Sequence, residues 1–407
     1  MTPLLAMTSM LPTPDHVPGA GLRPLAAQDA SLDEFTAAWE DVADFFRTES
    51  AHRGVVGGSL WFVRDGAVLG KVLHGMADAA EDRAVDDATI FHWASLTKTL
   101  TGIGILQLRD RGLLRLEDPA ANWLPELRSV HAAEGSVDDV TVGHLLSHTS
   151  GFRASTWPWG GDQPWHPFEP TRWEELATMM PWTELLFRPG ERFGYSNPGI
   201  VVLARILEEA SGEPWEAYVQ KWIFHPLELE GSYFRHTPPH LAPHRSNAYR
   251  LEGGIPVPRG PDFDPGITVS NSGWNAPVPD LVRYLAFLSG GAGEGGAGIL
   301  SRSSLEEMWM PRVEVGEGAA WGEPHEAMGL TFFLTSHAGG RLVGHAGRQW
   351  SHLSFFYLDP ETGAGAIGVV NTDGVAGPDR RLDARAFMNE VRARLVRDVF
   401  PTVPARR

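Results

Sequence analysis

A serine and a lysine three residues apart form the first group in the sequence that could do chemistry, Ser95-Leu96-Thr97-Lys98. If this segment is helical, residues three apart lie on one face, so the Lys98 amine can stand beside the Ser95 hydroxyl. A lysine accepts a proton only when it is neutral, and burial lowers the pKa of an amine from its reference value of about 10.4. The pair therefore predicts a serine nucleophile with a lysine base.

The residues that follow Lys98 bear on this interpretation, because Ser-x-x-Lys also occurs by chance on solvated helix faces. Residues 100–108 contain five leucines and isoleucines, which are too many for a surface helix. They therefore predict a buried helix. Desolvating a charge is costly unless the charge is paired or neutralised. A lysine at the start of such a helix therefore needs a function, and the context favours a catalytic pair.

A second group, Tyr195-Ser196-Asn197, lies among Pro-Gly and Asn-Pro-Gly turn residues just before an apolar helical run. We expect both Tyr195 and Asn197 on a loop, where rigid elements commonly present catalytic groups. A phenol beside an ammonium group can act as a base or return a proton to a leaving group, and an amide can bind a carbonyl or hold the lysine. The alternative is a tyrosine packed at a helix entrance that an asparagine caps.

The third group is His345-Ala346-Gly347-Arg348, between two segments that we expect to be strands, residues 330–334 and 353–358. Small residues let a strand edge approach a ligand closely. The next backbone N–H, that of Arg348, could then join the N–H of Ser95 in an oxyanion hole. Taken alone, a histidine in this position is more often structural.

In this order, the three groups resemble the motifs of the serine β-lactamase and penicillin-binding-protein superfamily. Tyr-x-Asn in the second place is similar to the branch that holds class C β-lactamases, esterases and D-amino-acid peptidases. His-x-Gly in the third place is similar to the esterases and peptidases of that branch. Residues 144–152, 187–190 and 369–371 also match, and the resemblance covers about residues 35–395.

The resemblance implies a two-step acyl transfer that needs neither a metal nor an organic cofactor. Ser95 would be the nucleophile, Lys98 its activating partner and Tyr195 the shared acid and base. The residues implied to bind the substrate are Asn197, His345, Gly347 and Arg348, the last through its backbone N–H.

Two features concern the substrate, and the first is a departure from the family pattern. Many members continue the third motif as Gly-x-Pro-Gly-Phe, whereas this chain continues with Gln349-Trp350-Ser351-His352, which would reshape the rim of the pocket. The loop after residue 151 is rich in tryptophan and proline. Its Trp157 and Trp159 could cover the pocket and favour an aromatic acyl group, or they could pack the loop onto the helices or form an oligomer contact.

We therefore expect a carboxylesterase for small or aromatic esters, with a small-molecule ester or amide as its only implied partner. The open alternatives within the enzyme class are a D-amino-acid peptidase or amidase, an acyltransferase and a weak β-lactamase. Since a fold does not guarantee an activity, a non-catalytic module that keeps the penicillin-recognising shape is the rival from another class. The sequence leaves the natural substrate and the oligomeric state open.

The composition agrees with such an enzyme. The chain has 407 residues and a net charge of −17, which argues against nucleic acid or an anionic membrane surface as a partner. The absence of cysteine excludes disulfides and thiolate chemistry. His144 and His148 have a spacing that a metal could use, but no third ligand accompanies them. No apolar run approaches the roughly 20 residues of a membrane span, and we expect a cytoplasmic location without excluding an exported form.

The elements that must position these groups follow from the hydrophobic pattern. We expect a helix at residues 32–46, strands at 55–63 and 67–72, helices through the middle, strands after 328 and a closing helix at 383–399. This order predicts an α/β fold of the α+β type, an antiparallel sheet flanked by helices with a mostly helical domain inserted. The predicted division is an arm at 1–30, a discontinuous α/β domain at 31–93 and 295–400, a helical domain at 94–294 and a tail at 401–407.

Overall fold

The computed structural model describes residues 30–154, 170–290, 298–316, 325–374 and 383–406. Within these ranges the main sheet has nine strands in the order β10-β11-β12-β13-β14-β15-β1-β2-β3, all paired antiparallel. Strands from both ends of the chain meet where β1 pairs with β15, so the predicted antiparallel sheet is confirmed. The strand bounds are β1 Gly57–Arg64, β2 Ala67–Asp78, β3 Arg83–Ala84, β10 Val313–Glu314, β11 Ala327–Met328, β12 Phe333–His337, β13 Gly340–Gln349, β14 His352–Leu358 and β15 Ala364–Val370.

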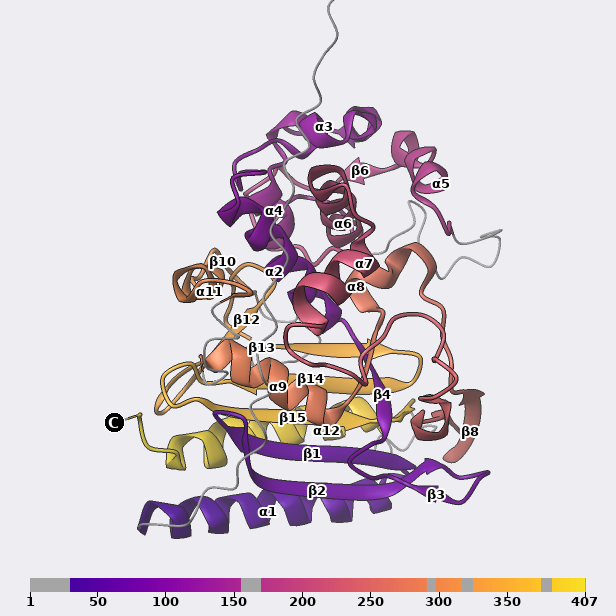
Figure 1. The fold of residues 1–407 in the computed structure, drawn as a ribbon, viewed down its shortest axis with the longest axis vertical. Helices are drawn as coiled ribbons and strands as arrows, with labels where there is room; N and C mark the ends of the chain where they lie inside the picture. Colours follow the sequence, from indigo (N-terminus) through magenta and orange to yellow (C-terminus); the bar gives the residue numbers. More distant parts are fainter. Residues whose placement is uncertain (1–29, 155–169, 291–297, 317–324, 375–382, 407) are drawn as a thin grey trace, which may run out of the picture.

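One face of the sheet is covered by two helices from opposite ends of the chain, α1 (Ala30–His52) and α12 (Ala384–Arg394) (Figure 1). The turn Leu395–Val399 continues α12. Apolar residues recur along α1 at helical spacing and point into a core shared with α12 and the sheet. The members of α1 in this core are Phe35, Trp39, Val42, Ala43 and Phe46.

The other face of the sheet carries α9 (Val278–Ser289), which crosses it in Figure 1, and beyond α9 the larger helical part of the molecule. Side chains alternate along β1, so that Leu60 and Phe62 join the core under α1 and α12, while Trp61 and Val63 join the core on the helical side. Both faces of the sheet are therefore buried, which makes it the rigid support of the molecule.

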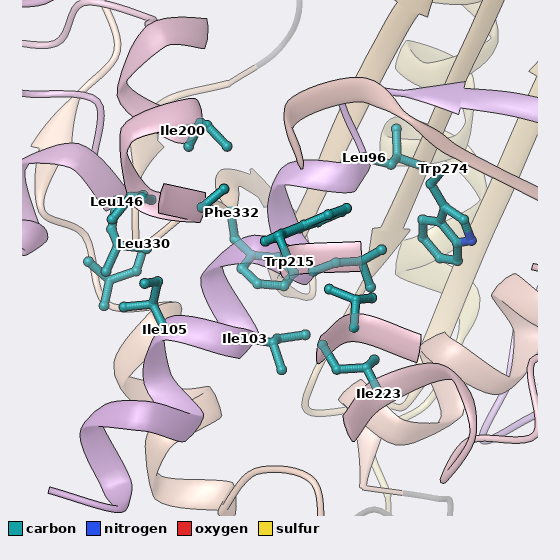
Figure 2. Close-up of a cluster of buried hydrophobic side chains, with 14 of the residues drawn as sticks. Leu96, Ile103, Ile105, Leu146, Ile200, Trp215, Ile223, Trp274, Leu330 and Phe332 are labelled. Carbon is teal, nitrogen blue, oxygen red and sulfur yellow. The ribbon is translucent and has the colours of Figure 1, made fainter. Parts of the chain in front are cut away.

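The helical part is organised around α2 (Thr97–Asp110), which is buried along its first twelve residues. Figure 2 shows Leu96, Ile103 and Ile105 on and beside this helix, packed among Leu146, Ile200 and Trp215 from neighbouring helices. The burial predicted for the run after Lys98 is thus confirmed. The surrounding helices are α3 Ala120–Trp123, α4 Val142–Leu146, α5 Trp173–Ala177, α6 Asn197–Ser211, α7 Trp215–Val219, α8 Val269–Ser272 and α11 Arg302–Met308.

Several short strands were not predicted. The pair β4 (Ile90–Ala94) and β9 (Trp274–Pro277) and the group β7 (Ala248–Glu252), β8 (Ile255–Gly260) and β16 (Thr372–Asp373) lie outside the main sheet, and β5 (His131–Ala132) pairs with β6 (Glu184–Leu185). Most of them are short and pair with distant segments, so local periodicity does not reveal them. The exception is the hairpin of β7 and β8, whose Gly253-Gly254 turn is a local signal that was overlooked. The predicted domain boundaries stay a prediction. Among the described helices, none has the length and apolarity needed to cross a bilayer.

Candidate active site

Ser95 lies in a tight turn between the end of β4 and the start of α2. The preceding residue, Ala94, has a φ of +51°, a left-handed conformation that is costly for a residue with a side chain. The Thr97 hydroxyl donates to the Ala94 carbonyl at 2.6 Å and accepts the Trp274 N–H at 3.0 Å, which ties the turn to β9. The strained turn leaves Ser95 9% exposed above the buried helix.

Lys98 is 0% exposed, and its Nζ lies 3.0 Å from Ser95 Oγ, as the spacing predicts. The amine also donates to the backbone carbonyl of Asn271 in α8 at 2.9 Å. Within the described ranges no carboxylate pairs with it, and burial holds the pKa of Lys98 well below its usual range. A neutral amine keeps a lone pair, so Lys98 can accept the proton of the Ser95 hydroxyl.

Tyr195 joins the second motif to the first. Lys98 Nζ lies 5.0 Å from the centroid of the Tyr195 ring, and the ring is packed against Phe333 of β12 and against two imidazoles. Those imidazoles belong to His148, at 4.5 Å between centroids, and His345, at 6.3 Å. The structure therefore brings the tyrosine of the second motif between the lysine of the first and the histidine of the third.

Asn197 is the first residue of α6, so the loop predicted for it ends one residue earlier. The cap is Ser196, whose Oγ accepts the Gly199 N–H at 3.0 Å, rather than the asparagine. In the described part of the chain the Asn197 amide makes no hydrogen bond to Lys98. The group that holds the amine is the Asn271 carbonyl instead.

The third motif lies between the two predicted strands, as expected, and is itself part of a strand, β13, which pairs with β12 and β14 on its two sides. His345 is buried, and its Nδ1 lies 2.6 Å from the Ala346 carbonyl. Since a carbonyl only accepts, Nδ1 carries a proton. Gly347 lies against the end of β4, where a Cβ would overlap the Trp93 carbonyl oxygen. Glycine thus lets β13 approach the backbone just before Ser95.

Arg348 follows on the opposite face of β13, the face covered by α12, as alternation along a strand requires. Its side chain is 46% exposed and forms an ion pair with Asp373 at 2.7 Å. The guanidinium is therefore turned away from His345. Only the backbone N–H of Arg348 can therefore act beside Ser95, and this is the role that the resemblance implies.

The residues predicted to reshape the pocket rim form the turn between β13 and β14. Trp350 and Ser351 both have positive φ, the conformation of a two-residue type I′ hairpin. The Trp350 ring stacks on Phe263 at 5.0 Å between centroids, and the Gln349 amide oxygen lies 3.0 Å from His92 Nε2 in β4. This rim is thereby fixed to the strand that leads to Ser95. Trp157 and Trp159 lie outside the described residues.

Two contacts at the site were missed. Nothing in the sequence of α8 marks Asn271 as the residue whose carbonyl holds Lys98, because every residue carries that group. From the sequence, His148 was noted in the matching segment 144–152 and as a possible metal pair with His144, but not as a contact of Tyr195. In the structure, His144 Nδ1 accepts the Thr141 N–H at the start of α4, whereas the His148 ring packs against the Tyr195 ring. Within the described ranges no three histidine, aspartate or glutamate side chains are grouped to hold a metal ion.

Comparison with known proteins places this chain in a family. The family model described as Beta-lactamase matches residues 42–388, most of the chain. This chain belongs to the β-lactamase family. The predicted superfamily, its fold and the assignment as a serine hydrolase on that fold are thereby confirmed.

Relatives within and around the family include enzymes of several kinds. Esterase EstB of Burkholderia gladioli is 28% identical over 359 residues, which are 80% of this chain and 89% of EstB. The structure of EstCE1, described as a hydrolase with promiscuous acyltransferase activity, matches with a TM-score of 0.71 and 19% identity over 90% of this chain and all of EstCE1. D-amino acid amidase from Ochrobactrum anthropi SV3 matches with a TM-score of 0.69 and 21% identity, over 91% of this chain and 99% of the amidase. At these identities the two structures show a shared fold.

Proposed function

We propose that this member of the β-lactamase family is a carboxylesterase for small or aromatic esters that forms an acyl-enzyme on Ser95. The observation that carries the proposal is the fully buried Lys98 amine, 3.0 Å from Ser95 Oγ and without a carboxylate partner in the described ranges. A charged lysine there would be costly, whereas a neutral one is a base in contact with a hydroxyl.

In the first half-reaction, Lys98 accepts the proton of Ser95 as Oγ attacks the ester carbonyl. The oxygen of that carbonyl becomes an oxyanion, for which the backbone N–H groups of Ser95 and Arg348 are the proposed donors. The bond to the alcohol then breaks. Tyr195 gives its phenolic proton to the departing oxygen and regains one from Lys98, whose amine lies 5.0 Å from the centroid of the Tyr195 ring.

In the second half-reaction, a water molecule attacks the acyl carbon. Tyr195 and Lys98 take its proton and return one to Ser95 Oγ as the acid departs. The sum is ester plus water giving acid plus alcohol, and the enzyme is regenerated.

An ester is the preferred substrate because of two observations. Esterase EstB, one of the relatives reported above, is 28% identical over 80% of this chain and 89% of its own length. The third motif also carries an imidazole, that of His345, where class C β-lactamases commonly have a lysine.

Labelling with a fluorophosphonate tests the nucleophile, and a substrate panel tests the class. Intact mass should show one phosphonyl group on the wild type and on Ser147→Ala, a matched variant of a buried serine in the same helical part, but none on Ser95→Ala. The panel holds p-nitrophenyl acetate, p-nitrophenyl phenylacetate, D-phenylalanine amide and a penicillin. Faster turnover of the amide than of either ester would replace the esterase by an amidase. No adduct and no turnover in folded protein would favour a binding module.

A further inference from the structure

We propose that His148 is a positioning residue for Tyr195, one that fixes the phenol by holding the peptide groups on both sides of it. This inference rests on the acid and base role of Tyr195 in the proposed function. No motif role was assigned to His148 from the sequence, and its contacts identify it.

Two hydrogen bonds reach the chain on either side of the tyrosine. The His148 carbonyl accepts the Gly194 N–H at 2.8 Å, and its ring Nδ1 accepts the Ser196 N–H at 3.1 Å. The two backbone N–H groups that flank Tyr195 therefore both donate to His148. Since buried N–H groups are costly when unpaired, these bonds select one path for the tyrosine backbone.

The ring of His148 also covers a face of the phenol. The two centroids are 4.5 Å apart with an interplanar angle of 31°, the shortest ring contact that Tyr195 makes in the described ranges. Lys98 Nζ lies 5.0 Å from the centroid of the same phenol ring. Backbone and side chain of Tyr195 are thus both fixed relative to the lysine.

The backbone of His148 is bent to allow this. Its φ is +56°, a left-handed conformation that few residues other than glycine, asparagine and aspartate adopt readily. The residue is fully buried just after α4. Strained conformations of this kind persist where the surroundings require them, and here the bend sends the carbonyl and the ring to the same segment.

The hydrogen-bond pattern fixes the protonation of the ring. Nδ1 accepts an N–H, so it must keep its lone pair and the neutral ring carries its proton on Nε2. The groups facing it are Lys98 from α2, His345 from β13 and the Tyr195 ring. Burial first, and then the positive charge that Lys98 and His345 can carry, hold the pKa of His148 well below its usual range. The ring therefore stays an acceptor and leaves the proton transfers to Lys98 and Tyr195.

A pair of amide variants tests the role. In His148→Asn the side-chain oxygen can take the place of Nδ1, and asparagine tolerates the positive φ. In His148→Gln the oxygen reaches the place of Nε2 instead, so the Ser196 N–H loses its acceptor. Because a displacement of about 1 Å can cost about 100-fold in rate, we expect kcat to fall at least about 30-fold in the Gln variant and no more than about fivefold in the Asn variant, with KM nearly unchanged. His144→Asn, a histidine of the same segment away from Tyr195, should keep the wild-type kcat.

A readout without turnover separates this inference from the proposed function. The chain has six tyrosines, so ¹⁹F NMR of protein labelled with 3-fluorotyrosine can resolve Tyr195, assigned through Tyr195→Phe. We expect one narrow Tyr195 signal in the wild type and in His148→Asn, and a broadened or split one in His148→Gln. Equal kcat and equal line shapes in the two variants would overturn the positioning role, even if Ser95 proved not to be the nucleophile. If the Gln variant does not fold, a loss above about 30-fold in folded His148→Asn overturns it.

Discussion

Gly347→Ala is the substitution whose effect follows most directly from the packing of β13 on β4. A Cβ at Gly347 would lie 2.7 Å from Ser354 Oγ and 3.1 Å from Ala94 Cβ, and it would overlap the Trp93 carbonyl oxygen. Ordinary contact with a Cβ begins at 3.4 Å, and the carbonyl belongs to the backbone, so β13 has to retreat by about 1 Å. The Arg348 N–H, the next donor along the strand, moves with it.

The expected loss is that of one oxyanion donor. Removing such a donor costs about 100-fold to 1,000-fold in kcat, and 100-fold corresponds to about 2.7 kcal/mol of transition-state stabilisation. Because the donor acts mainly on the charge that develops in the transition state, kcat and kcat/KM should fall together while KM stays nearly constant. Overpacking should also lower the free energy of unfolding by about 1–3 kcal/mol.

Steady-state hydrolysis of p-nitrophenyl acetate, per folded molecule, measures this effect. Gly368→Ala in β15 is the matched control, since a Cβ there would overlap the Phe355 ring instead of a backbone next to Ser95. We expect the control to lose stability but not kcat. A Gly347→Ala enzyme that is folded and as active as the wild type would refute the assignment of the oxyanion hole.

The other predictions concern the base, the tryptophan-rich loop after residue 151 and a buried carboxyl group. Lys98→Met should lower kcat by about 100-fold to 10,000-fold in ester assays while the melting temperature holds or rises, because a buried amine is replaced by an apolar chain; activity within tenfold of wild type would remove Lys98 as the base. Since burial lowers the pKa of Lys98, kcat/KM should decline as the pH falls through that lowered pKa, which lies well below the usual range of a lysine. Replacing Trp157 and Trp159 by alanine should lower kcat/KM for aromatic esters about tenfold relative to acetate, and unchanged kinetics in folded protein would remove the covering role. Burial raises the pKa of Asp280 from 3.8 to about 6, so its protonated form is favoured in the fold, and stability is lost as the pH rises through 6. The free energy of unfolding of Asp280→Asn, measured in urea, should therefore rise relative to that of the wild type by on the order of 1–3 kcal/mol between pH 5 and 8. A difference between the two proteins that stays constant over this range would contradict burial as the cause of the raised pKa.

The sequence predicted the parts of the site that depend on local pattern. The apolar run after Lys98 was enough to predict burial of the amine, and the fixed rise of a helix was enough to place it by Ser95. The small residues around Gly347 were expected to let a strand edge approach a ligand, and the close neighbour that the structure shows is the Trp93 carbonyl oxygen. The main sheet followed from alternating and apolar runs bounded by turn residues.

The remainder depends on contacts between distant segments. The Asn271 carbonyl that holds the Lys98 amine lies 173 residues further along the chain, and a backbone carbonyl has no signature in the sequence. The contact of His148 with the Tyr195 segment spans 48 residues and requires a left-handed backbone at a histidine, which no local rule predicts. The third motif was expected between two strands, and pairing with β12 and β14 makes its own segment a strand as well, although glycine has low strand propensity.

The most direct test of the central claim is to trap the acyl-enzyme during turnover. Wild-type protein is mixed with excess p-nitrophenyl butyrate, quenched in acid within the steady state, digested and mapped by mass spectrometry. We predict one butyryl group on the peptide that contains Ser95, at a level that decays once the ester is consumed. A butyryl group on another residue, or ester turnover that persists in Ser95→Ala without any covalent intermediate, would contradict the account.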